Sequence, residues 1–345
     1  MQFYKAPPPP INPRQVTQNV FIITIDGVRW QEIFTGADSL LLNDEQYTPD
    51  AATLNSMYWS TTSEERRKKL LPFFWNVIAA KGQLYGNRNY KNRMNVANSY
   101  AKSYPGYNEI LTGIDDPEIS SNQKIQNPNI NILEYLDKQP AFAGKVAAFS
   151  SWDVFPYILN SERNKMVINA GYQQYDEQSK TIISSVENGV YDKQATRYDD
   201  LTFITAKEYI KKKLPRVVLL GFGETDEFAH DGRYDLYLEQ AAKVDKMIAE
   251  LWHWVQTTPG YKDNTTFIIT TDHGRGSKKS KWTSHGEFIK GSSQTWMAVL
   301  GPHLEPLGEV KEPTQIYQQQ IAQTVAHLTG LPFENEEIAP AIVLK

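Results

Sequence analysis

The sequence contains no cysteine. This absence excludes disulfide bonds, metal sites built on thiolate ligands and a cysteine nucleophile. Histidine is also scarce, with six residues in a chain of 345. Any metal ion in this protein must therefore be bound by carboxylate and imidazole side chains, and half of the histidines lie close in sequence to aspartates that follow apolar runs.

An excess of positive charge and long apolar runs are absent too. The chain has 36 basic and 40 acidic residues and a net charge of -4, unlike the basic proteins that bind nucleic-acid duplexes. No apolar run approaches the roughly 18 residues of a membrane-spanning helix. With 40% hydrophobic residues, the chain can form a core. We therefore expect no duplex binding and no transmembrane segment, and the oligomeric state stays open.

Residues 1–18 have the composition of an extended lead-in, because the prolines from Pro7 to Pro10 cannot donate backbone hydrogen bonds and favour polyproline II. Residues 19–345 are predicted to form a single α/β domain. The lead-in resembles the tether that follows a removed export signal, so we expect an exported or periplasmic enzyme whose leader precedes the printed sequence. A cytoplasmic protein is the alternative.

Three apolar segments run into an aspartate or end shortly before one. Asn19–Asp26 reads NVFIITID, Arg216–Phe222 reads RVVLLGF and precedes Asp226, and Phe267–Asp272 reads FIITTD. The lack of polar alternation indicates strands that are covered on both faces, as in a parallel sheet. In open α/β sheets the ligand crevice lies at the carboxyl ends of the strands. The pattern therefore predicts that these aspartates gather at one edge of a sheet.

Segments with helical periodicity lie between the apolar segments, so predicted strands and helices alternate along the chain. This alternation predicts an α/β fold with a mostly parallel central sheet and helices on both faces. The region Thr35–Thr62 is expected to be irregular, and a small cap insertion is expected at about residues 160–200, where polar residues dominate. The predicted helices are Ser63–Ile78, bent or delayed at Pro72, Asn129–Lys138, Leu201–Lys212, Tyr234–Gln256 and Pro313–Thr329.

The first set of candidate metal ligands contains Asp226 and His230. These residues are four apart, so on a helix both side chains project from one face and can bind one ion. His285 lies beyond the loop after the last of the three strands and can complete this site. A mixture of carboxylate and imidazole ligands favours Zn²⁺, with Mn²⁺ or Fe as alternatives.

The second set of candidate ligands contains Asp26, Asp272 and His273, with Ser103 facing them. Pro105 follows Ser103 closely, which places this serine at or just before the N-terminus of a helix. A helix cap without a catalytic role is the alternative for Ser103, and a turn with an Asx cap is the alternative for Asp272.

These motifs resemble those of the alkaline phosphatase superfamily in their order along the chain, and they resemble its nucleotide pyrophosphatase/phosphodiesterase-like branch most. The resemblance runs from about Asn19 to Leu331 and rests on Ile25-Asp26-Gly27, Ser103-Tyr104-Pro105, Asp226 with His230, Asp272-His273-Gly274 and His285. It implies that one metal ion is held by Asp226, His230 and His285. The other ion is then held by Asp26, Asp272, His273 and the nucleophile, which falls on Ser103. The segment IDDPEISSN resembles the family stretch whose final Asn contacts the transferred phosphoryl group, here Asn122.

The resemblance implies a metal-dependent phosphoester hydrolase, a phosphodiesterase or phosphatase, with a small-molecule substrate, a serine nucleophile and two divalent metal ions. The alternatives are a sulfatase or phosphonate hydrolase of the same superfamily and a non-catalytic metal-stabilised binding protein. Phosphodiesterases often have Asn-His where this chain has Gly106-Tyr107, and sulfatases have Arg where it has Tyr107. Monoester, diester, sulfate and phosphonate substrates therefore all stay open.

Overall fold

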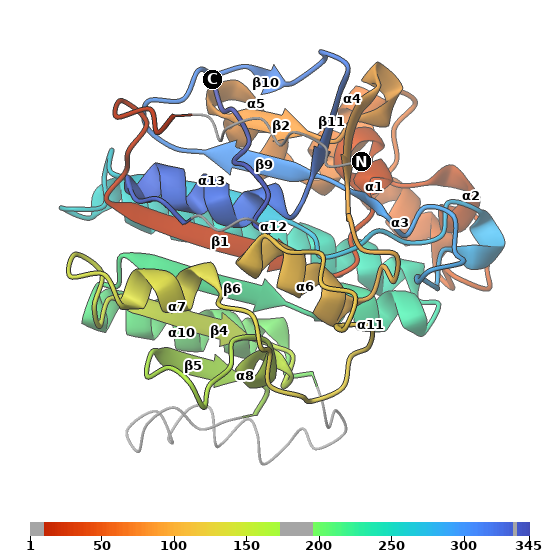
Figure 1. Ribbon diagram of the computed structural model, residues 1–345. Helices are drawn as coiled ribbons and strands as arrows, with labels where there is room; N and C mark the ends of the chain where they lie inside the picture. The colour runs from red at the N-terminus through yellow and green to blue at the C-terminus, as the bar shows by residue number, and fades with distance from the viewer. Residues whose placement is uncertain (1–9, 173–195, 334–336) are drawn as a thin grey trace.

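The computed structural model describes residues 10–172, 196–333 and 337–345. Its centre is an eight-stranded sheet in which the five strands from β7 to β5 run parallel, while β9 pairs antiparallel with β7 and β2. The mostly parallel sheet that the sequence predicts is confirmed (Figure 1). In spatial order the strands are β10 (Gly308–Glu309), β2 (Gln83–Tyr85), β9 (Met297–Leu300), β7 (Thr265–Thr270), β1 (Asn19–Ile25), β6 (Val217–Phe222), β4 (Val146–Ser150) and β5 (Val167–Ala170).

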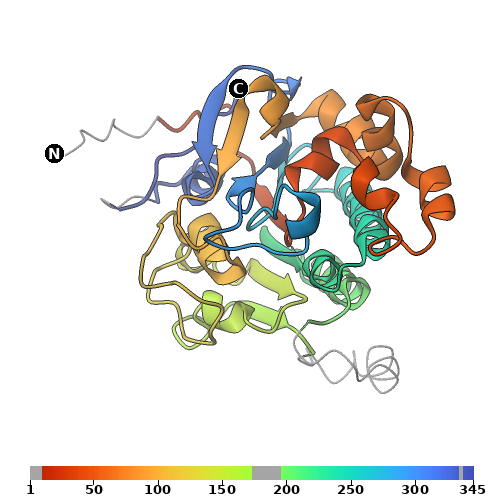
Figure 2. The ribbon, with the colours of Figure 1, turned by 90° about the vertical axis from the view of Figure 1, so that its right-hand side faces the viewer.

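Helices cover both faces of this sheet, as predicted, and Figures 1 and 2 show the two layers. Alternate residues of β1 point to opposite faces, so Phe21 and Ile23 belong to one apolar core and Val20 and Ile22 to the other. The first core includes side chains from α1 (Trp30–Thr35), α4 (Ser63–Leu70), α10 (Asp199–Lys213), α11 (Glu224–His230) and α12 (Tyr234–Thr257). The second includes side chains from α6 (Ser103–Thr112), α7 (Ile132–Asp137), α8 (Phe155–Ile158) and α13 (Gln320–Thr329).

A smaller sheet lies beside the main one and differs from the prediction. It contains β11 (Thr314–Tyr317), β3 (Asn92–Asn95) and β8 (Gln294–Thr295). The helix predicted at Pro313–Thr329 therefore begins only at Gln320. Ile316 is the one buried side chain of β11, so this short edge strand lacks the apolar pattern that would have distinguished it from a helix.

The region before β2 also contains more helix than expected. Thr35–Thr62 holds α2 (Ser39–Leu42) and α3 (Ala51–Tyr58), whose first turns are capped by Asp38 and Asp50. Pro72 interrupts the predicted helix Ser63–Ile78, as expected, because proline cannot donate the bond that continues it. The chain resumes in a π-helical turn, Phe74–Ile78, and α5 (Ala79–Lys81).

The predicted cap insertion at about residues 160–200 is not wholly separate from the sheet. Val167–Ala170 forms β5 and pairs in parallel with β4. Residues 173–195 of that segment lie outside the described residues. Residues 1–9 of the predicted lead-in also lie outside the described residues, and near its end the Thr17 amide donates to the Leu328 carbonyl at 2.7 Å.

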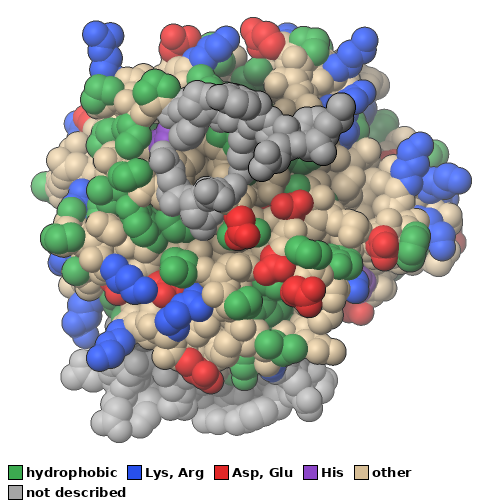
Figure 3. Space-filling view, viewed as in Figure 1, with side chains coloured by type: hydrophobic (Ala, Val, Ile, Leu, Met, Phe, Trp, Pro, Cys, Tyr) green, Lys and Arg blue, Asp and Glu red, His purple; other side chains and the backbone are tan. Residues whose placement is uncertain are grey.

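The surface agrees with the charge balance of the sequence. On the face in Figure 3, Lys and Arg side chains lie scattered among Asp and Glu side chains and form no single positive patch. Among the described residues, no helix combines the length and apolar character needed to cross a membrane.

Candidate active site

The three predicted aspartates lie at one edge of the sheet, beyond the carboxyl ends of three neighbouring strands. Asp26 follows β1 directly, Asp272 lies two residues beyond the end of β7, and Asp226 is in the first turn of α11, which follows β6. β1 lies between β7 and β6, so parallel pairing brings the three acids together. This is the position at which open α/β sheets bind ligands.

Asp26, Asp272 and His273 form the inner set of ligand-type side chains, and all three are buried. The Nε2 atom of His273 lies 3.5 Å from Asp26 Oδ1 and 3.4 Å from Asp272 Oδ2. The hydroxyl of Ser103 lies 3.2 Å from the same nitrogen. The structure thus brings together the four residues that the resemblance places at one metal ion.

The hydrogen bonds of His273 indicate which of its nitrogens is free. Nδ1 lies 3.0 Å from the Gly274 carbonyl, which can only accept, so Nδ1 carries the proton and Nε2 keeps its lone pair. In a serine–histidine–aspartate triad the acid contacts the nitrogen remote from the serine. Here both acids and the serine face the same nitrogen, so the arrangement is that of ligands around an ion and not of a triad.

Two carboxylate oxygens of the inner set need a partner. Asp26 Oδ1 and Asp272 Oδ2 are buried and accept no hydrogen bond from the described residues. Burial, together with the neighbouring acids, raises the pKa of Asp26 well above its ordinary value and raises the pKa of Asp272 to about 6. A divalent cation would satisfy these oxygens and offset their mutual repulsion, so the inner set fits a metal ion.

Backbone and hydroxyl donors fix the remaining oxygens of the inner set. The Gly27 amide donates to Asp272 Oδ1 at 3.1 Å, and the Tyr107 hydroxyl donates to Asp26 Oδ2 at 3.3 Å. Gly27 has a φ of +63°, and a Cβ there would lie 2.5 Å from Asp226 Oδ1. Glycine therefore allows the chain to turn past the acids without blocking them.

Asp226, His230 and His285 form the outer set. His230 Nε2 lies 3.1 Å from Asp226 Oδ2 and 3.1 Å from His285 Nε2, so His230 contacts both of the other members of the set. His285 Nδ1 donates to the Ala101 carbonyl at 3.0 Å, which leaves its Nε2 free as a ligand. The His230 side chain is 46% exposed, whereas that of Asp226 is 14% exposed.

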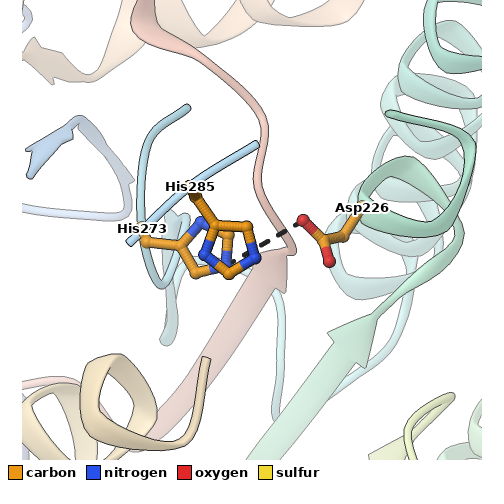
Figure 4. Close-up of side chains that lie close together, drawn as sticks. All are labelled: Asp226, His273 and His285. Carbon is orange, nitrogen blue, oxygen red and sulfur yellow. Dashed lines mark ion pairs between the residues drawn. The ribbon is translucent and has the colours of Figure 1, made fainter. Parts of the chain in front are cut away.

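The two sets adjoin each other. The imidazole rings of His273 and His285 stack with centroids 3.7 Å apart, and Figure 4 shows both rings beside the Asp226 carboxylate. Ligand atoms of Asp226, His273 and His285 lie within 4.8 Å of one another, as do those of Asp26, Asp272 and His273. His273 therefore lies between the two sets. These distances group it with either set, whereas the resemblance assigns it to the inner one.

Arg275 is a member of the site that the sequence analysis missed. Its buried guanidinium bonds Asp226 Oδ1 and the Thr283 carbonyl, and its Nε donates to the Trp282 carbonyl at 2.9 Å. Burial disfavours ionisation of Asp226, but Arg275 and then His230 hold the pKa of this carboxyl well below its ordinary value. The sequence signal that could have indicated Arg275 was its position directly after the Asp-His-Gly motif. Arg275 ties Asp226 to the loop that carries His285.

Ser103 is the first residue of α6 and not its cap. The N-cap position belongs to Lys102, whose side chain makes no capping bond. Further along α6, a Cβ on Gly106 would lie 2.3 Å from the Asp272 carbonyl, so only glycine lets the helix approach the strand end this closely. Gln318 Nε2 joins the same two segments by donating to the carbonyls of Gly106 and Asp272. These contacts hold Ser103 against the inner set.

Asn122 lies beside Ser103. Its Oδ1 accepts from the Tyr104 amide at 3.0 Å, one residue beyond Ser103, and the residue is exposed. Tyr107, in the position where sulfatases have Arg, is buried under the inner set and packs against Phe155 with ring centroids 4.6 Å apart. Asn122 therefore remains available for a bound ligand, whereas Tyr107 is part of the core.

Known proteins resemble this chain both in part of its sequence and in its fold. Residues 164–289 match the model of the Metalloenzyme superfamily. A 2,3-bisphosphoglycerate-independent phosphoglycerate mutase from Haloquadratum walsbyi is 25% identical over 123 residues. That match covers 34% of this chain and only 23% of the mutase.

Solved structures extend the similarity to nearly the whole chain. A variant of the alkaline phosphatase PafA superposes with a TM-score of 0.62 at 10% identity, over 95% of this chain and 98% of that one. The chain has the alkaline phosphatase fold. A 2-O GAG sulfatase shares this fold, with a TM-score of 0.61 at 11% identity over 94% of this chain and 73% of that one. The alkaline phosphatase-like fold that the resemblance implies is thus confirmed.

Proposed function

We propose that this protein is a metal-dependent phosphoester hydrolase with Ser103 as its nucleophile. The observation that carries the proposal is the convergence on His273 Nε2 of the Ser103 hydroxyl and of two carboxylates with unsatisfied oxygens. A purely structural metal site has no use for a serine that faces the ligands.

The inner and outer sets would hold two divalent cations, of which Zn²⁺ suits the donors best and Mn²⁺ or Fe are alternatives. Such cations stabilise a serine alkoxide and offset the charge on the phosphoryl oxygens. We assign one ion to Asp26, Asp272, His273 and Ser103, and the other to Asp226, His230 and His285.

The reaction proceeds in two displacements on phosphorus. Ser103 Oγ loses its proton and forms a bond to phosphorus while the bond from phosphorus to the leaving alkoxide breaks, and that alkoxide takes up a proton. Water then attacks the phosphoseryl group, which releases the phosphate product and restores the Ser103 hydroxyl. Asn122 donates its amide to a phosphoryl oxygen beside the N-terminus of α6, where backbone amides favour an anion.

The charges near Ser103 favour a diester over a monoester. Arg29 is paired with Glu32, Lys124 with Asp153, and Arg275 with Asp226. Lys102, the residue before Ser103, has no ion-pair partner among the described residues, and its Nζ donates to the Ser120 carbonyl. A dianionic monoester needs a cationic clamp, whereas a monoanionic diester is matched by the neutral amide of Asn122.

The test compares hydrolysis of a bis-aryl phosphodiester and an aryl phosphate monoester by the wild type and by Ser103→Ala, with metal content measured in parallel. We expect chelator-sensitive hydrolysis, faster on the diester, that Ser103→Ala abolishes while metal is retained. Inactivity on both esters in metal-loaded protein contradicts the proposal; turnover of an aryl sulfate or phosphonate would then identify the alternative hydrolases. Metal binding without turnover of any of these esters would identify a binding protein.

We further propose that the enzyme is exported or periplasmic. The proline-rich lead-in supports this location. Sequencing the native reading frame and fractionating the source cells tests it. An apolar leader before Gln2 is expected, and cytoplasmic fractionation with translation starting at Met1 contradicts the proposal.

A further inference from the structure

The segment between β3 and α6, residues 96–102, contacts the candidate site at two points. At its end it leads into Ser103, and the Ala101 carbonyl accepts the hydrogen bond that orients His285. Ala101 has a φ of +45°, in the left-handed region that a residue with a Cβ rarely adopts. Such a conformation persists only where surrounding contacts hold it.

Glu109 supplies contacts that hold this segment. Its side chain is completely buried, and its carboxylate accepts from the Ala97 amide at 2.9 Å and from both the amide and the side chain of Asn98. Burial raises the pKa of Glu109 to about 7, although these donors favour the ionised form.

Asn98 carries the restraint from Glu109 to Ala101. While its Nδ2 donates to Glu109, its Oδ1 accepts from the Tyr100 amide at 3.0 Å and from the Ala101 amide at 2.8 Å. Hydrogen bonds therefore connect Glu109, on the helix that begins with Ser103, through Asn98 to the Ala101 amide, and the carbonyl of that same residue orients His285.

We propose that Glu109 is a positioning residue that sets the geometry of His285 relative to Ser103 through Asn98 and Ala101. The proposal rests on the proposed function, in which His285 is a metal ligand and Ser103 the nucleophile. Glu109 touches neither the reacting atoms nor an ion; it acts on the site through residues 97–101. Mutation of a residue that hydrogen-bonds to a metal ligand commonly lowers metal affinity or activity by about tenfold to a hundredfold.

The test uses Glu109→Gln, which keeps the shape of the side chain but turns an amide donor toward backbone donors. Glu134→Gln is the matched control, because Glu134 is also a buried helical carboxylate with several donors, Arg163 and Lys138, but lies on α7. Asn98→Ala breaks the same set of bonds at its second member and decides the question if Glu109→Gln does not fold.

Two readouts separate positioning from a structural role. We expect Glu109→Gln and Asn98→Ala to lower kcat by about tenfold to a hundredfold with little change in KM, and to weaken Co²⁺ binding and alter the Co²⁺ absorption spectrum. Glu134→Gln should lower the melting temperature only. Wild-type kcat and Co²⁺ spectra in both variants would overturn the proposal.

The Co²⁺ readout does not depend on turnover. If the wild type binds Co²⁺ but hydrolyses no ester, the proposed function fails, and the spectra of the variants still decide whether Glu109 positions His285. If the wild type hydrolyses esters and the variants match it in kcat and in Co²⁺ spectrum, only the role of Glu109 fails. If the wild type binds neither Co²⁺ nor Zn²⁺, Mn²⁺ or Fe and hydrolyses no ester, both proposals fail.

Discussion

The inner and outer sets use the same kinds of side chain but differ in how the fold holds them. Asp26, Asp272 and His273 are buried at the ends of central strands, whereas the outer set comes from helix α11 and from a loop, and the His230 side chain is 46% exposed. One oxygen of each inner acid receives no hydrogen bond from the described part of the chain, while Asp226 is already paired with Arg275. The fold thus forms one position that needs a cation and one that is open to solvent.

The electrostatics of the two sets differ in the same way. Burial and like charges raise the pKa values of Asp26 and Asp272, whereas Arg275 and His230 overcome burial and lower the pKa of Asp226. A cation would relieve repulsion in the inner set and would compete with a guanidinium in the outer one. We therefore expect tight binding at the inner set and exchangeable binding at the outer set.

The largest effect is expected from Asp272→Ala. This change removes a ligand from the inner set, so it should abolish tight metal binding and lower kcat by more than the roughly hundredfold seen for outer partners of metal ligands. Elemental analysis and diester hydrolysis measure both effects. Asp231→Asn, at an exposed acid at the end of α11, is the control and should behave as the wild type. Full metal content and activity in Asp272→Ala would remove the inner set from the mechanism.

A smaller and reversible effect is expected from His230→Ala. The exposed outer set should lose its ion while the inner ion is retained, and kcat should fall by about tenfold to a hundredfold at low metal concentration. Raising the free metal concentration should restore part of the activity, since Asp226 and His285 remain. Loss of both ions in this variant would mean that the two sets form one cooperative site.

The pH dependence of stability distinguishes the sets in metal-free protein. The folded-state pKa of Asp272, about 6, exceeds its ordinary value of 3.8, so its stabilising contribution is complete below pH 3.8 and is lost as the pH rises through 6. The free energy of unfolding of the wild type relative to Asp272→Asn should thus fall by up to about 3 kcal/mol over this range. Denaturant melts at several pH values measure it. A pH-independent difference would contradict the burial argument.

The smallest effect is expected from Tyr107→Phe. Removing the hydroxyl deletes one donor to Asp26, which costs roughly 1 kcal/mol, or about fivefold in the affinity of the inner set. A competition titration with a metal indicator measures this change. Thr112→Val, on the same helix but outside the site, is the control for packing. A Tyr107→Phe affinity equal to that of the wild type would show that Asp26 needs no donor once a cation is bound.

The sequence alone was enough to place the site residues that belong to a regular local pattern. Continuous apolar runs located Asp26 and Asp272, the four-residue spacing placed Asp226 and His230 on one helical face, and Pro105 placed Ser103 at a helix start. The site residues that it could not place depend on tertiary contacts. Arg275 meets Asp226 only after α11 and the loop after β7 have packed, and Glu109 meets Asn98 only after residues 96–102 have folded against α6.

The same distinction explains which strands the sequence analysis did not predict. The central strands are buried on both faces and read as unbroken apolar runs, whereas β11 and β5 are short edge strands with half-exposed residues. Gln315 and Tyr317 are exposed, so the sequence of β11 shows no clear apolar pattern that distinguishes a strand from a helix. Edge position, which is a property of the assembled sheet, could not be inferred locally.

Chelator titration with elemental analysis tests the difference between the two sets most directly. The wild type should contain about two divalent ions per chain. It should lose them in two steps as chelator increases, and His230→Ala should show only the tighter step. Loss of both ions in one step would contradict the inequality of the two sets. A metal-free protein that stays folded and hydrolyses the diester in excess chelator would contradict the metal-dependent account itself.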